Sequence, residues 1–157
     1  MRKALRYRLF GMGKMPEQMK AVVSSAGVIV ADEGLPIRNQ VRSLRIPGAK
    51  VGGAVRSSSG ALVILPDRLL ASVLNYVIVD TAFDADGKQE LELGSDGVHL
   101  RFDVATVFER GSGSVEIHYR LPLDDSVLSR LPVRSCHVGV THAFDALLRP
   151  WTGSYSS

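Results

Sequence analysis

The spacing of apolar residues is helical near the start of the chain and changes to alternation near residue 27. The helical stripe consists of Met15, Met19, Val22 and Val23. These positions repeat at the intervals that place side chains on one face of a helix. Pro16 favours the first helical turn, and Gly27 is suited to end the helix. We therefore expect a short helix over about residues 16–25.

Downstream of this helix the apolar pattern has a period of two, which is typical of half-buried strands. We expect strands near 28–31, 37–42, 61–65, 69–74, 77–79, 90–93, 98–103, 115–121 and 135–140. Turns are expected at 32–34, 47–53, 57–60, 66–67, 84–87, 95–97 and 111–114, with a hairpin at 84–87. Short strands punctuated in this way favour a mostly β fold, either a bent antiparallel sheet or a partly open barrel of about seven strands.

Two further helices are expected after the strands. Asp124 is a good N-cap for a short helix over 125–131, which Pro132 ends. Thr141 is placed to cap a second helix that reaches Leu148, and the chain from Pro150 onward is expected to be frayed. The length of 157 residues fits one domain, which we divide into a basic arm (1–14), the main domain (15–131) and a C-terminal extension (132–157).

The clearest strand pair is formed by residues 98–103 and 115–121. The residues expected inside are Val98, Leu100, Phe102, Val115, Ile117 and Tyr119. His99 and His118 fall on the opposite, outward face and are expected to be cross-strand neighbours. Two histidines in this position are able to bind metal adventitiously, but we expect them to be solvent-facing residues in charge pairs.

Composition places the chain among ordinary globular proteins, with 45% hydrophobic and 22% charged residues. A single cysteine, Cys136, cannot form an internal disulfide, and no apolar run is long enough to span a bilayer. We therefore expect a cytoplasmic protein. The net charge of +3 conceals an asymmetry: residues 1–56 hold 11 Lys/Arg and 3 Asp/Glu, whereas residues 57–132 hold 6 and 12. This asymmetry indicates either an anionic partner or mutual neutralisation within the fold or between subunits.

The central run Gly60-Ala-Leu-Val-Ile-Leu-Pro-Asp-Arg-Leu-Leu-Ala71 resembles the signature of bacterial pleckstrin-homology-like and GRAM-like domains. In that signature an apolar strand enters a turn with a polar residue and Arg, and another apolar strand follows at once. The resemblance covers about residues 27–131. It implies a strongly bent antiparallel sheet plugged at one end by a C-terminal helix, and a role in binding or scaffolding rather than catalysis. The basic pair with which some members bind phosphoinositides is missing, so lipid headgroup binding is not expected.

Basic residues in the first predicted strands and the glycine-rich segment are the best candidates for a binding site. The tentative anion-binding set is Arg38, Arg42, Arg45, Lys50 and Arg56. Backbone amides of the turn around Gly48, Gly52 and Gly53 would complete an anion-binding nest. The alternative is a solvated strand face whose charges prevent edge-to-edge aggregation. The segment lacks aromatic residues, so nucleic acid is an unlikely partner.

No set of residues has the spacing of a catalytic or metal centre. Cys136 and His137 are neighbours on a predicted strand and point to opposite faces, so they do not form a dyad; His142 and Asp145 do not complete a zinc motif. The carboxylate pairs Asp84/Asp86 and Asp124/Asp125 are explained by turn and cap chemistry. We expect no catalytic residue, no metal and no cofactor.

The sequence therefore predicts a non-catalytic binding or scaffold domain that self-associates. A small-ligand carrier or an enzyme built on a β-barrel cavity is one alternative, and it would require polar groups inside the barrel. A binder of anionic surfaces that uses the basic N-terminal third is another. Self-association is expected because the apolar strands 69–74 and 77–79 need a cover, from the first helix, from the tail or from a second subunit.

Overall fold

The computed structural model describes residues 3–4, 8–9, 11–24, 27–83, 86–141 and 148. The strands are β1 (Val30–Ile46), β2 (Ala49–Ile64), β3 (Arg68–Val73), β4 (Tyr76–Ala82), β5 (Gln89–Gly94), β6 (Gly97–Asp103), β7 (Ser112–Arg120) and β8 (Ser135–Val138). They form one antiparallel sheet in the order β4-β3-β2-β1-β7-β6-β5-β8, nearly closed into a barrel. The predicted mostly β class and bent antiparallel sheet are confirmed.

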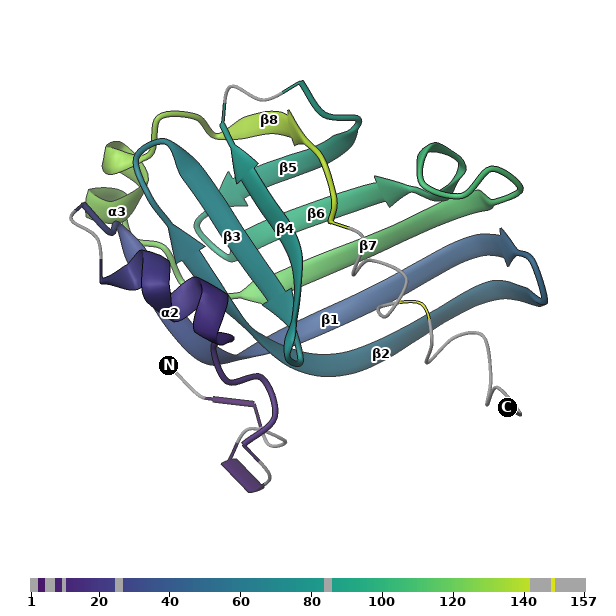
Figure 1. The fold of residues 1–157 in the computed structure, drawn as a ribbon, viewed down its shortest axis with the longest axis horizontal. Coiled ribbons are helices and arrows are strands. Elements are labelled where there is room, and N and C mark those ends of the chain that lie inside the picture. The colour runs from purple at the N-terminus through teal and green to yellow at the C-terminus, as the bar shows by residue number, and fades with distance from the viewer. Residues whose placement is uncertain are drawn as a thin grey trace.

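The bend of the sheet encloses the main core. Strands β3 and β4 run at a steep angle to β1, β7 and β6, and the β1–β2 hairpin extends beyond them (Figure 1). Apolar residues from every strand fill the space between, including Phe102 and Tyr119, which are fully buried. The helix α3 (Asp125–Arg130) adds buried Leu128 to this core. Its predicted cap is confirmed, because the Val127 amide donates to Asp124 Oδ1 at 2.9 Å.

A smaller apolar cluster lies on the other face of the sheet, beneath helix α2 (Glu17–Val23). Met19 of this helix is fully buried and packs with residues of β2, β3 and β4 such as Val63, Leu70 and Val77. The predicted helix and its apolar stripe are therefore confirmed. The helix supplies the cover that the apolar strands were expected to need, so these strands do not by themselves call for a second subunit.

Strand β1 continues through the segment where a turn was predicted at 32–34, and that prediction is wrong. The register with β2 shifts between Asp32 and Leu35, and Gly34 has a φ of +67°, as in a β-bulge. The N-terminal segment satisfies the freed backbone groups: the Ala4 amide donates to Gly34 O, and the Gly34 amide donates to Gly13 O. Turn-forming residues therefore serve here as a bulge inside a strand.

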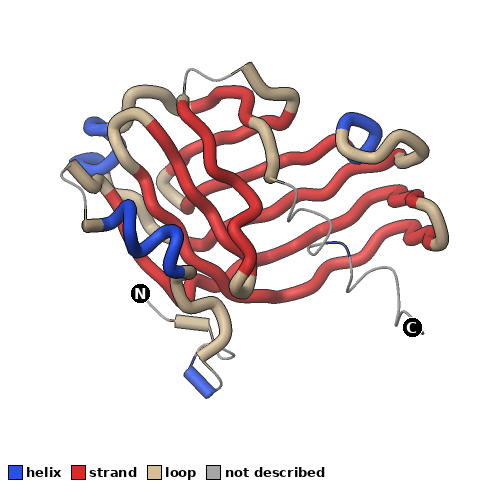
Figure 2. The backbone as a smooth tube through the Cα atoms, viewed as in Figure 1, coloured by secondary structure: helices blue, strands red, loops and turns tan. Residues whose placement is uncertain are grey.

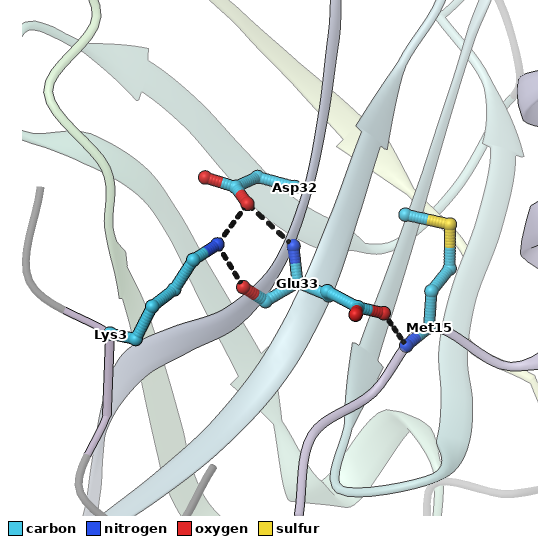
Figure 3. A network of polar contacts seen from close by, with 4 residues as sticks. All are labelled: Lys3, Met15, Asp32 and Glu33. Atoms are coloured by element: carbon cyan, nitrogen blue, oxygen red, sulfur yellow. Dashed lines mark hydrogen bonds and ion pairs between the residues drawn. The ribbon is translucent and has the colours of Figure 1, made fainter. Parts of the chain in front are cut away.

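Side chains reinforce the same junction between the N-terminal segment and the bulge (Figure 3). Lys3 Nζ contacts both Asp32 Oδ1 and the carbonyl oxygen of Glu33. The amide of Met15 donates to Glu33 Oε2 at 2.6 Å. Lys3, Ala4 and Gly13 of the predicted basic arm are thus held against β1.

Strand β2 also continues where turns were predicted at 47–53 and 57–60. Only Pro47 and Gly48 form the hairpin turn, and the strand then runs without a break around the bend of the sheet (Figure 2). The serine-rich segment stays extended because each residue pairs with β1, as Ser57 does with Arg38. Gly60 is required at the bend, since a Cβ on it would lie 2.0 Å from the carbonyl oxygen of Ser72 on β3.

The predicted hairpin at 84–87 is wrong, although Asp84 and Ala85 lie outside the described residues. Strand β4 pairs with β3, and β5 pairs with β6 and β8, so β4 and β5 are not hairpin partners. The segment instead connects β4, at one end of the sheet, to β5, which lies next to β8 at the other end. These ends are also brought together by Thr141, whose amide donates to Ile78 O at 2.9 Å and whose hydroxyl donates to Val77 O.

The end of the chain is described only in part. The predicted strand at 135–140 is observed as β8, over four residues. Most of the predicted helix after Thr141, and the tail from Pro150, fall outside the described residues. Within the described part of the chain, no helix has the length and apolar character needed to cross a membrane.

Candidate functional site

Polar side chains cover the outer face of β1, β7, β6, β5 and β8 and line a groove of about 560 Å³, called here the outer groove. They form two rows that run across the strands in register. The first row is Arg38, His118, His99, Glu92 and Ser135. The second row is Gln40, Glu116, Arg101, Glu90 and His137. One residue from each of five strands therefore contributes to each row.

The alternation of each strand explains why the groove is polar and its floor is rigid. Leu91, Leu100 and Ile117 point from the same strands into the main core and are buried. Their neighbours along each strand must then point outward. The floor of the groove is a hydrogen-bonded sheet that packs on the core. The backbone positions that carry the groove side chains are therefore held in place.

The second row holds charges of opposite sign that, among the described residues, form no ion pair with one another. Arg101 lies in register between Glu90 and Glu116. Among the described residues, the Glu116 side chain forms one ion pair, with Arg42 at 3.9 Å, and the side chains of Arg101 and Glu90 form no ion pair or hydrogen bond. Charged groups so placed remain available to a ligand.

The first row contains a compact cluster of two histidines and a carboxylate. His99 and His118 are directly opposite each other, and their rings stack with centroids 3.9 Å apart and an interplanar angle of 15°. The predicted cross-strand pair is confirmed. Asp96, in the turn between β5 and β6, places Oδ2 3.1 Å from His99 Nε2 and 3.7 Å from His118 Nε2.

The protonation of this cluster follows from its contacts. The hydrogen bond with His99 is the main reason that the pKa of Asp96 lies below its ordinary value. The pKa of His118 is also lowered, chiefly because burial disfavours the charged ring. His118 Nε2 lies 3.1 Å from the backbone carbonyl oxygen of Asp96, which ties the turn to β7.

The predicted anion-binding residues are divided between several places. Arg38 lines the outer groove, and Arg42 lies four residues further along the same strand. Arg45 and Lys50 are exposed and oppose each other near the tip of the β1–β2 hairpin. Arg56 pairs in register with Asn39, which is buried, so it lies on the face opposite the groove.

The glycine-rich turn that was expected to form an anion-binding nest is shorter than predicted. Gly52 and Gly53 are strand residues of β2, and only Gly48 lies in the hairpin turn, with a φ of +86°. A nest needs successive amides that converge on one point, whereas amides alternate in direction along a strand. The basic side chains, and not the glycines, are the feature of this hairpin that an anion would meet.

Cys136 and His137 point to opposite faces of β8, as predicted. The Cys136 side chain packs against the main core, and burial raises the pKa of its thiol. His137 lines the outer groove. His142 and Asp145 lie outside the described residues, so the described chain brings no further group to the thiol.

Sequence reasoning missed the role of Glu90, Glu92, Arg101, Glu116 and His137 as one surface. Each of these residues was visible as the outward position of an alternating strand. Their assembly depends on the strand order, in which β1 lies beside β7 and β8 beside β5. Strand order is not encoded in the local alternation of any single strand.

Comparison with protein-family models, curated proteins and solved structures gives no match to this chain.

Proposed function

We propose that this chain is a non-catalytic binding domain and that the outer groove is its ligand site. The observation that carries this proposal is a groove of about 560 Å³ on a rigid sheet, lined by charged side chains of which Arg101, Glu90 and Glu92 form no ion pair among the described residues. That volume is within the range of about 300–1,000 Å³ typical of small-molecule sites. The interior of the sheet is packed with buried apolar side chains, which favours an external site over the alternative of a carrier or enzyme with a polar barrel cavity.

The fold is compatible with the pleckstrin-homology-like or GRAM-like assignment that we propose for residues 27–131. A bent antiparallel sheet followed by a helix is what that resemblance implies, and α3 directly follows β7. The lone cysteine supports a cytoplasmic location in this proposal, because nothing in the sequence requires an oxidising compartment.

The charges of the groove indicate the class of ligand. Arg101 is suited to a carboxylate, because its guanidinium presents a planar fork of donors. Glu90 and Glu116 are its neighbours on both sides and are suited to an ammonium group. A zwitterion such as an amino acid or a short peptide carries both groups at a spacing that adjacent strands can match, since facing Cβ atoms are about 5 Å apart.

The proposal is tested by calorimetric titration and thermal melts with the standard amino acids and a set of dipeptides. Acetate and methylamine serve as ligands with a single charge. At least one zwitterion is expected to bind and to raise the melting temperature. Arg101→Gln and Glu90→Gln are each expected to weaken binding of that zwitterion about tenfold or more. Arg110→Gln, an exposed arginine away from the groove, is the matched control. Failure of every zwitterion to bind, or equal binding by the variants, would contradict the proposal.

A second candidate function is binding to anionic surfaces through the β1–β2 hairpin. The observation that favours it is the exposure of Arg42, Arg45 and Lys50 on the part of the hairpin that extends beyond β3 and β4 (Figure 1). Vesicles with acidic lipids should retain the chain at low salt and release it as salt is raised, whereas neutral vesicles should not retain it. Loss of retention in an Arg45→Gln/Lys50→Gln variant is expected; retention equal to that of the unmodified chain excludes this site.

Self-association is part of the proposed function, and the open edge of β2 is the surface that would support it. Strand β2 pairs with β3 only from Gly60 to Ile64. In the described chain, residues 51–55 therefore have a strand partner on the β1 side alone. An open edge is a template for pairing with another strand, and Val55 adds an apolar side chain that is 50% exposed.

A further inference from the structure

We propose that Asp96, His99 and His118 form an open binding site for a divalent transition-metal ion at the β5–β6 end of the outer groove. The proposal goes beyond binding of a zwitterion and does not depend on it. It rests on three side chains whose ligand atoms all lie within 4.8 Å of one another.

The distances suit one ion between three ligands. A tetrahedral zinc ion with bonds of about 2.0–2.1 Å holds its ligand atoms about 3.3 Å apart. Asp96 Oδ2 lies 3.1 Å from His99 Nε2 and 3.7 Å from His118 Nε2, so the carboxylate oxygen is already near both distances. To aim both nitrogens at the same point, the stacked rings must rotate about their side-chain bonds, and His118 Nε2 must exchange its contact with the Asp96 carbonyl oxygen for the ion.

The backbone holds the three residues in place. His99 and His118 are directly opposite on the adjacent strands β6 and β7. The two-residue turn that carries Asp96 is fixed by Gly97, which has a φ of +130° and where a Cβ would lie 1.9 Å from the carbonyl oxygen of Tyr119. The turn therefore lies close against β7 and directs Asp96 over the histidine pair.

The donor set indicates the class of ion. Two imidazoles and one carboxylate match the three-ligand sites of zinc, in which a fourth position stays open to water or another ligand. Calcium and magnesium prefer oxygen-only sites, and the Irving–Williams order favours Cu²⁺, Zn²⁺ and Ni²⁺ at nitrogen ligands. Glu92 opposes His99 in register and adds negative charge on the β5 side.

The third ligand explains why the sequence did not predict this site. Asp96 and His99 are three residues apart, but they belong to a turn and a strand, and His118 is much further along the chain. This spacing differs from the common zinc motifs, such as Cys-x₂₋₄-Cys followed by His-x₃₋₅-His, or His-Glu-x-x-His. The cluster arises only because β6 and β7 pair in the register that places the histidines opposite each other.

A calorimetric titration of the full chain with Zn²⁺ near neutral pH tests the proposal. One ion per chain is expected, and His99→Ala, His118→Ala and Asp96→Asn should each weaken binding by about tenfold or more. His137→Ala is the matched control, because it removes a histidine of the same groove that is not part of the cluster. Zn²⁺ should raise the melting temperature of the unmodified chain and of the control only.

Absorption spectra with Co²⁺ provide a second readout that does not depend on stability. The ligand-field bands of low-coordinate Co²⁺ should appear with the unmodified chain and disappear in Asp96→Asn, an exposed turn substitution that leaves the core intact. If no variant weakens binding, or if His137→Ala weakens it equally, the ion binds adventitiously and the proposal is wrong. Arg101→Gln, which tests the zwitterion, should keep Zn²⁺ binding, so the two proposals can fail separately.

Discussion

Tyr119 shows how a single side chain connects distant strands of the sheet. It is fully buried on β7, and its hydroxyl donates to the carbonyl oxygen of Ser72 on β3 at 2.8 Å. Burial raises the pKa of this phenol, so it stays protonated and able to donate. The bond crosses the interior between strands that are not neighbours, and it helps to hold the sheet in its bent form.

Phe102 contributes to the same core through volume alone. It is fully buried on β6 and pairs in register with Val115. Phe102→Ala is expected to lower the free energy of unfolding by about 3–5 kcal/mol, because it removes apolar contacts and leaves a cavity. Denaturant melts measure this loss, and Val55→Ala at the exposed edge should change it by about 0.5 kcal/mol or less. A loss under about 1 kcal/mol at Phe102 would place the residue outside the core.

Cys136 is expected to behave as a structural thiol. Burial raises its pKa, so the thiolate that reacts with alkylating reagents is scarcer at neutral pH than in an exposed cysteine. Labelling should therefore be slow in the native state, accelerate as pH rises, and become fast after denaturation. Fast labelling of the native protein at mildly acidic pH would instead indicate an activated thiol.

Among the elements, β2 is constrained by two neighbouring strands. It pairs with β1 along its length and passes to β3 at Gly60, where the backbones meet closely. Helix α2, in contrast, has seven residues and is too short to be stable alone, so its packing against the outer face of β2 to β4 maintains it. The conformation of β2 is therefore determined by strand pairing, and that of α2 by burial of its apolar side chains.

Two glycines of β2 provide a matched test of this close approach. Gly60→Ala places a Cβ 2.0 Å from Ser72 O, so the strands must separate, and we expect a loss of about 1–3 kcal/mol in unfolding free energy. Gly53→Ala meets only Val41 O at 3.9 Å and should be neutral or slightly stabilising. Equal effects of the two substitutions in denaturant melts would show that the bend tolerates a side chain.

For the whole molecule, the charge asymmetry is only partly resolved within one chain. Basic residues dominate 1–56 and acidic residues dominate 57–132. Among the described residues, the ion pair that joins these two segments is Arg42 with Glu116, at 3.9 Å and largely exposed. Exposed pairs of this kind contribute little to stability. Complementary charge therefore remains available for contact between copies.

Self-association is expected to use the open edge of β2. Light scattering at micromolar concentration should give a mass above that of one chain, and closed symmetry is the usual result. Val55→Lys adds a charge at this edge and should shift the protein toward monomer, whereas Tyr76→Lys, an exposed apolar position on β4, should not. A mass of one chain at both low and high salt would contradict self-association.

Local patterns in the sequence were sufficient to predict α2, the β6–β7 pair and the cap at Asp124. In each case the relevant interactions are between residues close along the chain, or follow from one face being dry and the other wet. The same reasoning failed at 32–34 and 57–60, because Asp, Ser and Gly are compatible with turns and also with a bulge or a crowded strand. The contacts that favour a bulge at 32–34 come from the N-terminal segment, and those that favour a strand at 57–60 include the close approach of β3.

The outer groove and the histidine cluster belong to the tertiary structure. Alternation alone identified Arg38, His99 and His118 as outward residues, but only the pairing of β1 with β7 and of β7 with β6 brought them into one row. Pairing between distant strands is decided by the total burial of the sheet, which is a property of the whole chain. The chemistry of each side chain was therefore readable from the sequence, while its neighbours, and with them any site, were set by how the sheet closed.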